Sequence, residues 1–82
     1  MNIEVARIYR LDSEGSVKAF VDLQFGEEFL VLGFKVIDGK DGMFVGMPSQ
    51  AGKNGRFYNT FLPLTDDIKQ QITDLILGAY QE

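Results

Sequence analysis

The stretch from Val36 to Ser49, V-I-D-G-K-D-G-M-F-V-G-M-P-S, constrains the fold more than any other part of the chain. It places three glycines, a proline and two aspartates between apolar residues. Glycine tolerates backbone angles that other residues avoid, and proline cannot donate a hydrogen bond to a neighbouring strand. The stretch therefore predicts a loop over 38–42, then a short strand over Met43–Met47 that ends at Pro48. We expect its glycines to hold conformations that a side chain would forbid.

Period-two patterns predict two strands near the start of the chain. The clearest pattern runs from Val17 to Phe25, where every second residue is apolar. Asn2–Leu11 is a second, less regular pattern, because Arg7 falls on the apolar face and Ile8 on the polar face. Its expected apolar face consists of Ile3, Val5, Tyr9 and Leu11. The polar segment between the two strands, Asp12–Ser16, is typical of a hairpin connection.

The next predicted strand, Phe29–Ile37, is apolar on both faces. Such a strand needs cover on both sides. A single short helix covers only one face of a small sheet, so a second copy of the chain is the expected cover for the other face. Gly33 inside the strand indicates a bulge or a close backbone approach.

The remainder of the chain predicts one strand and one helix. Ser49–Gly55 is polar and glycine-rich and is expected to be the least structured part, whereas Arg56–Leu62 has strand character and is closed by Pro63. Thr65 is a suitable N-cap for a helix, since two aspartates follow it. One helical face is apolar, with Ile68, Ile72, Leu75, Ile76 and Ala79. The predicted fold is α+β: an antiparallel meander of about five strands with a C-terminal amphipathic helix packed on it, one domain over residues 1–82, forming a homodimer.

Composition excludes several classes of function. The 82 residues contain no Cys and no His, which removes thiol nucleophiles, imidazole bases and the usual zinc ligands. We therefore expect no enzyme, no metal and no cofactor. No apolar run reaches the roughly 20 residues that span a bilayer, and the N-terminus does not resemble a signal peptide, so a cytoplasmic protein without membrane contact is expected. The net charge of −4 would repel a polyanion, and any nucleic-acid site must be a local basic patch.

Three other motifs have a structural interpretation that is favoured over a functional one. Asp38 and Asp41 could act as paired carboxylates or bind a hard cation, but their neighbouring glycines are typical of turns. G-K-D-G and G-K-N-G lack the spacing of a phosphate-binding loop. The helix carries mainly acidic polar residues, which is the wrong sign for anionic lipid.

Scattered cations form the remaining candidate site. Lys40 lies in the first glycine loop, while Lys53 and Arg56 lie in the second. Arg7, Arg10 and Lys35 are further basic residues, and Phe57 and Tyr58 could stack on bases. On pattern alone, solvated surface charge is the favoured interpretation of this set.

The glycine-rich stretch resembles the hallmark of the stage V sporulation protein G (SpoVG) family, which is close to V-I-D-G-x-x-G-x-F-V-x-M-P-S. The matching residues are Ile37, Asp38, Gly39, Gly42, Phe44, Val45, Met47, Pro48 and Ser49. An R-x-x-R strand, a D-x-x-G turn, a glycine before Phe57, a proline before the helix and a tyrosine near its end also occur in register. The resemblance covers nearly the whole chain.

The resemblance implies a cytoplasmic, dimeric regulator that binds DNA and RNA and is linked to septation and sporulation. Family members usually carry basic residues directly after M-P-S, where this chain has Gln50 and Ala51. The expected nucleic-acid contacts are therefore Lys40, Lys53 and Arg56. The hallmark residues are expected to be structural: Asp38, Gly39, Gly42, Phe44, Pro48 and Ser49. A different class of function also stays open, namely a dimeric protein–protein adaptor in cell division or transcription that does not touch nucleic acid.

Overall fold

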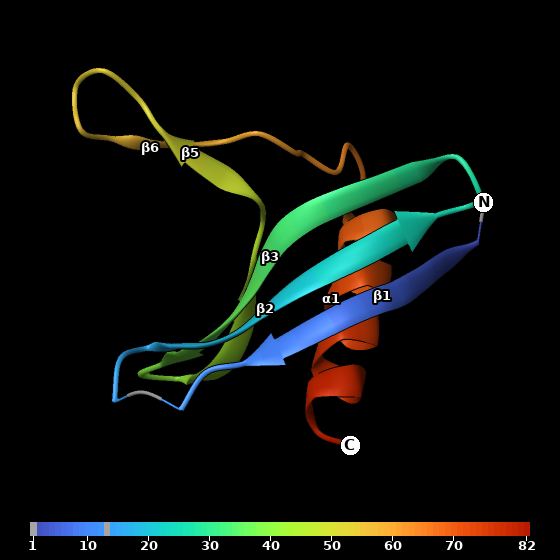
Figure 1. Cartoon of the computed structure of the whole chain (residues 1–82), viewed down its shortest axis with the longest axis horizontal. Coiled ribbons are helices and arrows are strands. Elements are labelled where there is room, and N and C mark those ends of the chain that lie inside the picture. The colour runs from blue at the N-terminus through green and yellow to red at the C-terminus, as the bar shows by residue number, and fades with distance from the viewer. Residues whose placement is uncertain (1, 13) are drawn as a thin grey trace.

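The computed structural model describes residues 2–12 and 14–82, and this part of the chain forms two β-sheets and one helix (Figure 1). The first sheet is antiparallel, in the order β1-β2-β3-β4, and consists of β1 (Ile3–Arg10), β2 (Val17–Phe25), β3 (Phe29–Gly39) and β4 (Gly42–Gly46). A separate antiparallel hairpin consists of β5 (Ser49–Ala51) and β6 (Phe57–Asn59). The C-terminal helix α1 (Asp66–Tyr80) covers one face of the larger sheet.

This arrangement confirms the α+β class and the meander but not the single sheet of about five strands. Ser49–Gly55, predicted to be the least structured part of the chain, contains β5 at its start, and β5 pairs with β6. The predicted strand Arg56–Leu62 is shorter than expected and does not join the meander. The predicted connection Asp12–Ser16 lies between the antiparallel strands β1 and β2, with Ser13 outside the described residues.

The core lies between β2, β3 and α1. Ala19, Val21 and Leu23 of β2 are fully buried, as the alternating pattern predicts, whereas Phe20 between them is exposed. They pack with Phe34 and Val36 of β3. From α1 come Ile72 and Ile76, which are also fully buried. The helix begins as expected, since the Thr65 hydroxyl accepts the Ile68 N–H at 3.3 Å.

A bulge in β1 corrects the predicted faces of that strand. The pairing with β2 shifts between Val5 and Arg7, so that Ala6 is an additional residue in β1. An extra residue reverses every side chain that follows it. Ile8 therefore packs against the core, and Tyr9 points to the other face, where it is 48% exposed. The irregular pattern around Arg7 and Ile8 reflects this bulge.

The predicted irregularity at Gly33 is confirmed. The pairing of β2 with β3 shifts opposite Asp22, and Gly33 has a φ of +92°. The Gly33 N–H donates to the Asp22 carboxylate at 3.3 Å instead of to a strand carbonyl. After this bulge, Phe34 and Val36 point into the core. Before it, Leu30 and Leu32 are 57% and 59% exposed, so the outer face of β3 has no cover within the chain.

The hallmark glycines serve two different purposes. Gly42 has a φ of +121° in the turn between β3 and β4, as predicted. The expectation of a forbidden conformation was wrong for Gly39 and Gly46, which do not have positive φ. They leave room for neighbouring side chains: a Cβ at Gly39 would lie 2.9 Å from the Phe44 ring, and one at Gly46 would lie 3.0 Å from Ile37.

Candidate nucleic-acid interface

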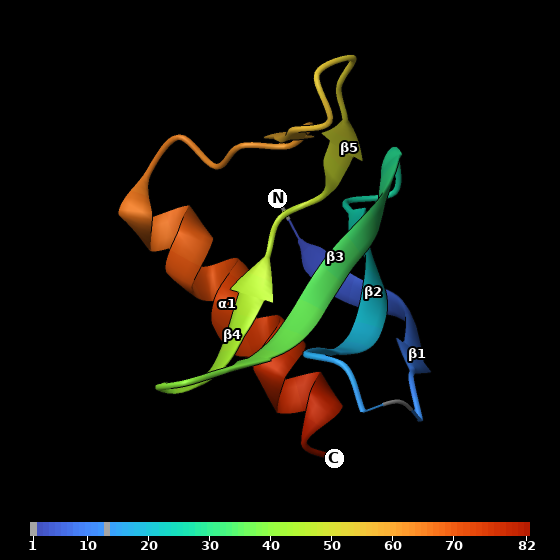
Figure 2. The same cartoon turned by 90° about the vertical axis from the view of Figure 1, so that its left-hand side faces the viewer.

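The hairpin of residues 49–59, here called the arm, projects away from the sheet and helix (Figures 1 and 2). Its turn is shaped by the Gly52 N–H, which donates to the Arg56 carbonyl at 2.7 Å, and by Gly55, which has a φ of +79°. The Asn54 side chain accepts the Arg56 N–H at 3.1 Å. Lys53 and Arg56 therefore flank one tight turn, and both are exposed.

Lys40 lies elsewhere. It occupies the turn between β3 and β4, which lies at the opposite end of the structure from the arm in both ribbon views (Figures 1 and 2). Lys40 is exposed. Within one chain, the fold brings Lys53 and Arg56 together but leaves Lys40 apart from them.

Two aromatic rings accompany the arm cations. Phe57 is 71% exposed and Tyr58 is 52% exposed. The Tyr58 ring lies over Gly52, where any Cβ would overlap it, and its hydroxyl accepts from the Asn54 amide at 2.9 Å. Tyr58 is thus held in place by the arm itself, whereas Phe57 presents most of its surface to solvent.

Lys35 connects the arm to the sheet. Its ammonium group donates to the Ser49 hydroxyl at 3.1 Å and lies 5.9 Å from the centre of the Phe57 ring. Sequence reasoning counted Lys35 among scattered cations and did not select it for the site. The available signal was its position one residue before the buried Val36, which places it on the face of β3 opposite the core.

The remaining hallmark residues make contacts inside the fold. The Asp38 N–H donates to the Ser16 carbonyl at 2.8 Å, and the carbonyl of the buried Pro48 accepts the Thr60 N–H at 2.8 Å. Ser49 accepts from Lys35, as described above. The contacts of Pro48 and Ser49 hold the base of the arm. Phe61 follows the arm, and its ring centre lies 5.4 Å from those of Phe25 and Phe34, tilted to the first ring and edge-on to the second. The hallmark therefore orients the arm relative to the sheet.

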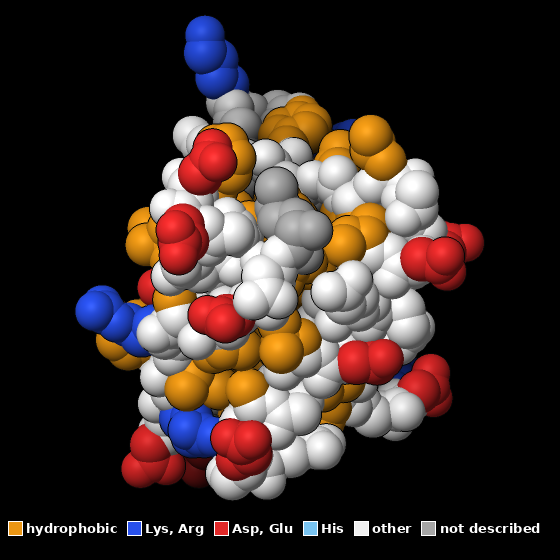
Figure 3. Space-filling model, turned by 90° about the vertical axis from the view of Figure 1, so that its right-hand side faces the viewer, with side chains coloured by type: hydrophobic (Ala, Val, Ile, Leu, Met, Phe, Trp, Pro, Cys, Tyr) orange, Lys and Arg blue, Asp and Glu red, His pale blue; other side chains and the backbone are white. Residues whose placement is uncertain are grey.

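The described residues contain no group of three or more His, Cys, Asp or Glu side chains that could hold a metal ion. Residues 2–12 and 14–82 also contain no helix with the length and hydropathy needed to cross a membrane. The side of the molecule that faces the viewer in Figure 3 shows acidic side chains spread among hydrophobic and uncharged ones, with Lys and Arg side chains mainly toward its margins. That side is a poor surface for a polyanion.

The similarity of this chain to known proteins extends beyond the hallmark and covers its full length. A sequence model of the family described as SpoVG matches residues 1–82. The chain belongs to the SpoVG family. It is 42% identical over 80 residues to a provisionally named septation protein SpoVG of Archaeoglobus fulgidus, covering 98% of this chain and 94% of that protein. A protein of the same name from Clostridium perfringens is 37% identical over 82 residues, covering 100% and 91%.

A third SpoVG relative is longer. The protein of this name from Symbiobacterium thermophilum is 41% identical over 80 residues, which are 98% of this chain but 57% of that protein. The hallmark stretch, residues 36–49, thus leads directly into the arm, and the arm presents exposed cations and rings.

Proposed function

We propose that this SpoVG protein is a homodimeric regulator that binds DNA or RNA, with Lys40, Lys53 and Arg56 contacting phosphate. The observation that carries the proposal is the arm, which presents two exposed cations on one turn beside the exposed Phe57 ring. Phosphate contacts position a nucleic acid without reading its sequence. By analogy with the name of its relatives, the regulated process is septation.

The uncovered outer face of β3 supports the proposed dimer. Leu30 and Leu32 are adjacent on this face and are more than half exposed. Burying them against a second copy would remove apolar surface from water, at about 25 cal/mol per Å². A dimer also doubles the number of arms, which offsets the small number of cations in each chain. The Lys40 of each copy adds a further phosphate contact to this doubled set.

Equilibrium binding across a salt series tests the proposal. The purified protein is titrated against labelled DNA and RNA of mixed sequence from low to physiological salt. The logarithm of the binding constant should fall linearly with the logarithm of salt, with a slope of about 0.7 to 0.9 per neutralised phosphate. The double variant Lys53→Ala/Arg56→Ala should bind more weakly and with a shallower slope. Lys69→Ala on the exposed face of α1 is the matched control and should behave as the wild type. Absence of binding at low salt rejects the proposal.

A protein–protein adaptor is the second candidate function. A groove of about 470 Å³ between β1 and α1 favours it, because apolar side chains and three carboxylates line the groove. The lining includes Ile3, Val5 and Leu75, with Glu4, Asp74 and Glu82. An acidic, partly apolar groove suits a basic protein segment better than a nucleic acid. This function would be supported if a protein partner co-purifies after nuclease treatment. The substitution Glu4→Lys in the groove should then release that partner.

A further inference from the structure

The turn of the arm contains an asparagine whose neighbour favours a spontaneous reaction. The chain has three asparagines: Asn2 precedes Ile3, Asn59 precedes Thr60, and Asn54 precedes a glycine. A backbone nitrogen can attack the side-chain amide of the asparagine before it, and a β-branched side chain on the attacking residue hinders the approach. Glycine has no side chain to shield its nitrogen. Asn54 is therefore the most reactive asparagine of this chain.

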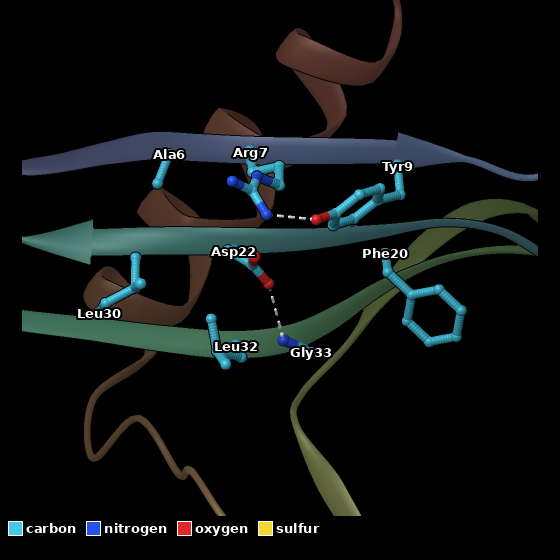
Figure 4. Close-up of a pocket in the computed structure, with 8 residues that line it drawn as sticks. All are labelled: Ala6, Arg7, Tyr9, Phe20, Asp22, Leu30, Leu32 and Gly33. Atoms are coloured by element: carbon cyan, nitrogen blue, oxygen red, sulfur yellow. Dashed lines mark hydrogen bonds between the residues drawn. The ribbon is translucent and has the colours of Figure 1, made fainter.

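This turn lies outside the proposed dimer contact. That contact is the outer face of the larger sheet, where Leu30 and Leu32 line a depression of about 650 Å³ together with Arg7 (Figure 4). None of the described residues that line the depression belongs to the arm. The turn between β5 and β6 projects away from the sheet (Figures 1 and 2), and Asn54 and Gly55 in it are exposed. The proposed contact therefore leaves the turn open to solvent.

Three hydrogen bonds restrain the groups that take part in the reaction. The Gly55 N–H, which carries the attacking nitrogen, donates to the Gly52 carbonyl at 3.1 Å. The side-chain oxygen of Asn54 accepts the Arg56 N–H at 3.1 Å, and its amide nitrogen donates to the Tyr58 hydroxyl at 2.9 Å. Attack requires the Asn54 side chain to rotate toward the Gly55 nitrogen, and it requires that nitrogen to lose its proton. The closed turn therefore protects Asn54.

The arm opens more readily than the core of the fold. Each of its strands has three residues, and a two-stranded hairpin is at best marginally stable on its own. Such segments open locally without unfolding of the whole protein. When opening and closing are fast relative to a reaction of the open form, the reaction rate follows the open population. The rate of reaction at Asn54 is therefore set by the fraction of molecules in which the arm is open.

We propose that Asn54 is a site of spontaneous deamidation and that opening of the arm controls its rate. In the open arm, the Gly55 nitrogen attacks the side-chain carbonyl carbon of Asn54. A carbon–nitrogen bond forms there, and the bond from that carbon to the amide nitrogen breaks. The amide nitrogen leaves as ammonia and takes the proton that the Gly55 nitrogen gives up. Water then opens the cyclic imide at one of its two carbonyl carbons, which gives aspartate or isoaspartate.

Deamidation changes the charge and the geometry of the turn. It places a carboxylate between Lys53 and Arg56, and a carboxylate repels phosphate. Isoaspartate also routes the main chain through the side chain of residue 54. This lengthens the segment that the hydrogen bond from the Gly52 N–H to the Arg56 carbonyl closes at 2.7 Å. The reaction is thus a slow, one-way decrease in the affinity of the arm for a polyanion, a consequence that rests on the proposed function.

Peptide mapping of aged protein tests the site and its dependence on the arm. Purified protein is kept folded in mildly alkaline buffer for several weeks, and samples are digested with chymotrypsin for mass spectrometry. Aspartate and isoaspartate should accumulate at position 54, while Asn59 stays unchanged. Tyr58→Phe and Lys35→Ala should each react about three- to tenfold faster, because each loses a hydrogen bond that holds the arm closed. Lys69→Ala on α1 is the matched control and should react at the wild-type rate.

Two results of this experiment would overturn the inference. The first is a wild type in which position 54 stays as unreacted as Asn59. The second is a wild-type rate in Tyr58→Phe or in Lys35→Ala, since deamidation would then not depend on opening of the arm. Circular dichroism of each variant shows that a faster reaction does not come from global unfolding.

Two substitutions of Asn54 separate this inference from the proposed function. Asn54→Asp mimics the product, and Asn54→Ser keeps a neutral hydrogen-bond acceptor. In a titration with DNA or RNA, Asn54→Asp should bind more weakly than Asn54→Ser, with a salt slope smaller by about one phosphate. Equal affinities would overturn the consequence for binding. If fresh wild-type protein binds neither nucleic acid, the proposed function is rejected, whereas deamidation is decided by the peptide map alone.

Discussion

The guanidinium of Arg10 lies at the C-terminal end of α1 and supplies a charge that the helix lacks. It donates to the carbonyl oxygens of Ala79 and Tyr80 at 3.1 Å and to that of Glu82 at 3.4 Å. The last carbonyls of a helix lack the amide partners that the next turn would supply, and the helix dipole makes this end negative. The Ala79 carbonyl also accepts the Glu82 N–H at 3.4 Å. The last turn of α1 contains no basic residue of its own. The Arg10 side chain of β1 therefore caps the C-terminal end of α1 and attaches the helix to the edge strand of the sheet.

Arg10→Ala should lower the free energy of unfolding by about 1–2 kcal/mol, because several helix carbonyls lose a charged donor. Arg10→Lys keeps the charge but loses the planar guanidinium group, so its free energy of unfolding should lie between those of the wild type and Arg10→Ala. Urea unfolding followed by circular dichroism measures both variants. Lys53→Ala, in the exposed turn of the arm, is the control and should match the wild type. An Arg10→Ala protein as stable as the wild type would contradict the assigned role.

Two glycines with open space around them should respond to alanine in opposite directions. A Cβ at Gly33 or at Gly78 would meet no atom within 4 Å, so crowding affects neither substitution. Gly33 has a φ of +92°, and a side chain there costs about 1–2 kcal/mol of stability. Gly78 lies inside α1, where alanine should add up to about 1 kcal/mol. Thermal unfolding of the two variants checks this, and a Gly33→Ala protein more stable than the wild type would show that the bulge relaxes without strain.

At the scale of elements, the arm is the part of the structure with the least support. A two-stranded hairpin is at best marginally stable alone in water. The arm has three residues in each strand, and all three residues of β6 are exposed. Its described attachments are the Lys35 contact with Ser49, the hydrogen bond between Thr60 and Pro48, and the Phe61 ring behind it.

Amides inside the arm should therefore exchange with deuterium at least about a hundredfold faster than those of β2, because they open locally without global unfolding. Hydrogen exchange measured by NMR gives both rates in one sample. Lys35→Ala should increase exchange in the arm further while leaving β2 unchanged, and Lys18→Ala on β2 serves as the control. Equal protection of arm and β2 would mean that the arm unfolds only with the whole protein.

The sequence predicted a strand or helix well where a single periodic pattern determines it. β2 alternates without interruption, and α1 has a clear N-cap and an apolar face, so both were predicted with their buried residues. The bulge at Ala6 was not predicted. A bulge is defined by how a strand pairs with its neighbour, and the sequence of β1 alone does not contain that pairing. β5 was missed for a related reason: its three residues become a strand only by pairing with β6.

At the scale of the whole molecule, the sequence indicates only part of the spatial arrangement of the candidate residues. Lys53 and Arg56 are close in sequence and flank one turn, which local pattern indicates. Lys40 was grouped with them, but in the folded chain the arm leads away from Lys40. The direction of the arm depends on long-range contacts of Pro48 and Ser49, which local sequence does not show. Lys35 entered the site for the same reason, since only the folded chain shows it beside Phe57.

Sedimentation velocity tests the dimer. At micromolar concentration the protein should sediment with twice its chain mass of 9.2 kDa. Leu30→Lys/Leu32→Lys places charge in the proposed contact and should give a folded monomer, because burying unpaired charge is costly. Leu64→Lys, at a side chain that is 95% exposed before α1, should remain dimeric. A wild-type monomer at this concentration would contradict the proposed assembly.

The most direct test of nucleic-acid binding is photo-crosslinking to an oligonucleotide that contains iodouracil, followed by mass spectrometry of the attached peptides. Crosslinks form where a base stacks on a ring, so the adducts report contact and not affinity alone. We expect adducts on the arm peptide that contains Lys53, Arg56 and Phe57. Adducts confined to α1, or none at low salt, would contradict a nucleic-acid site built on the arm.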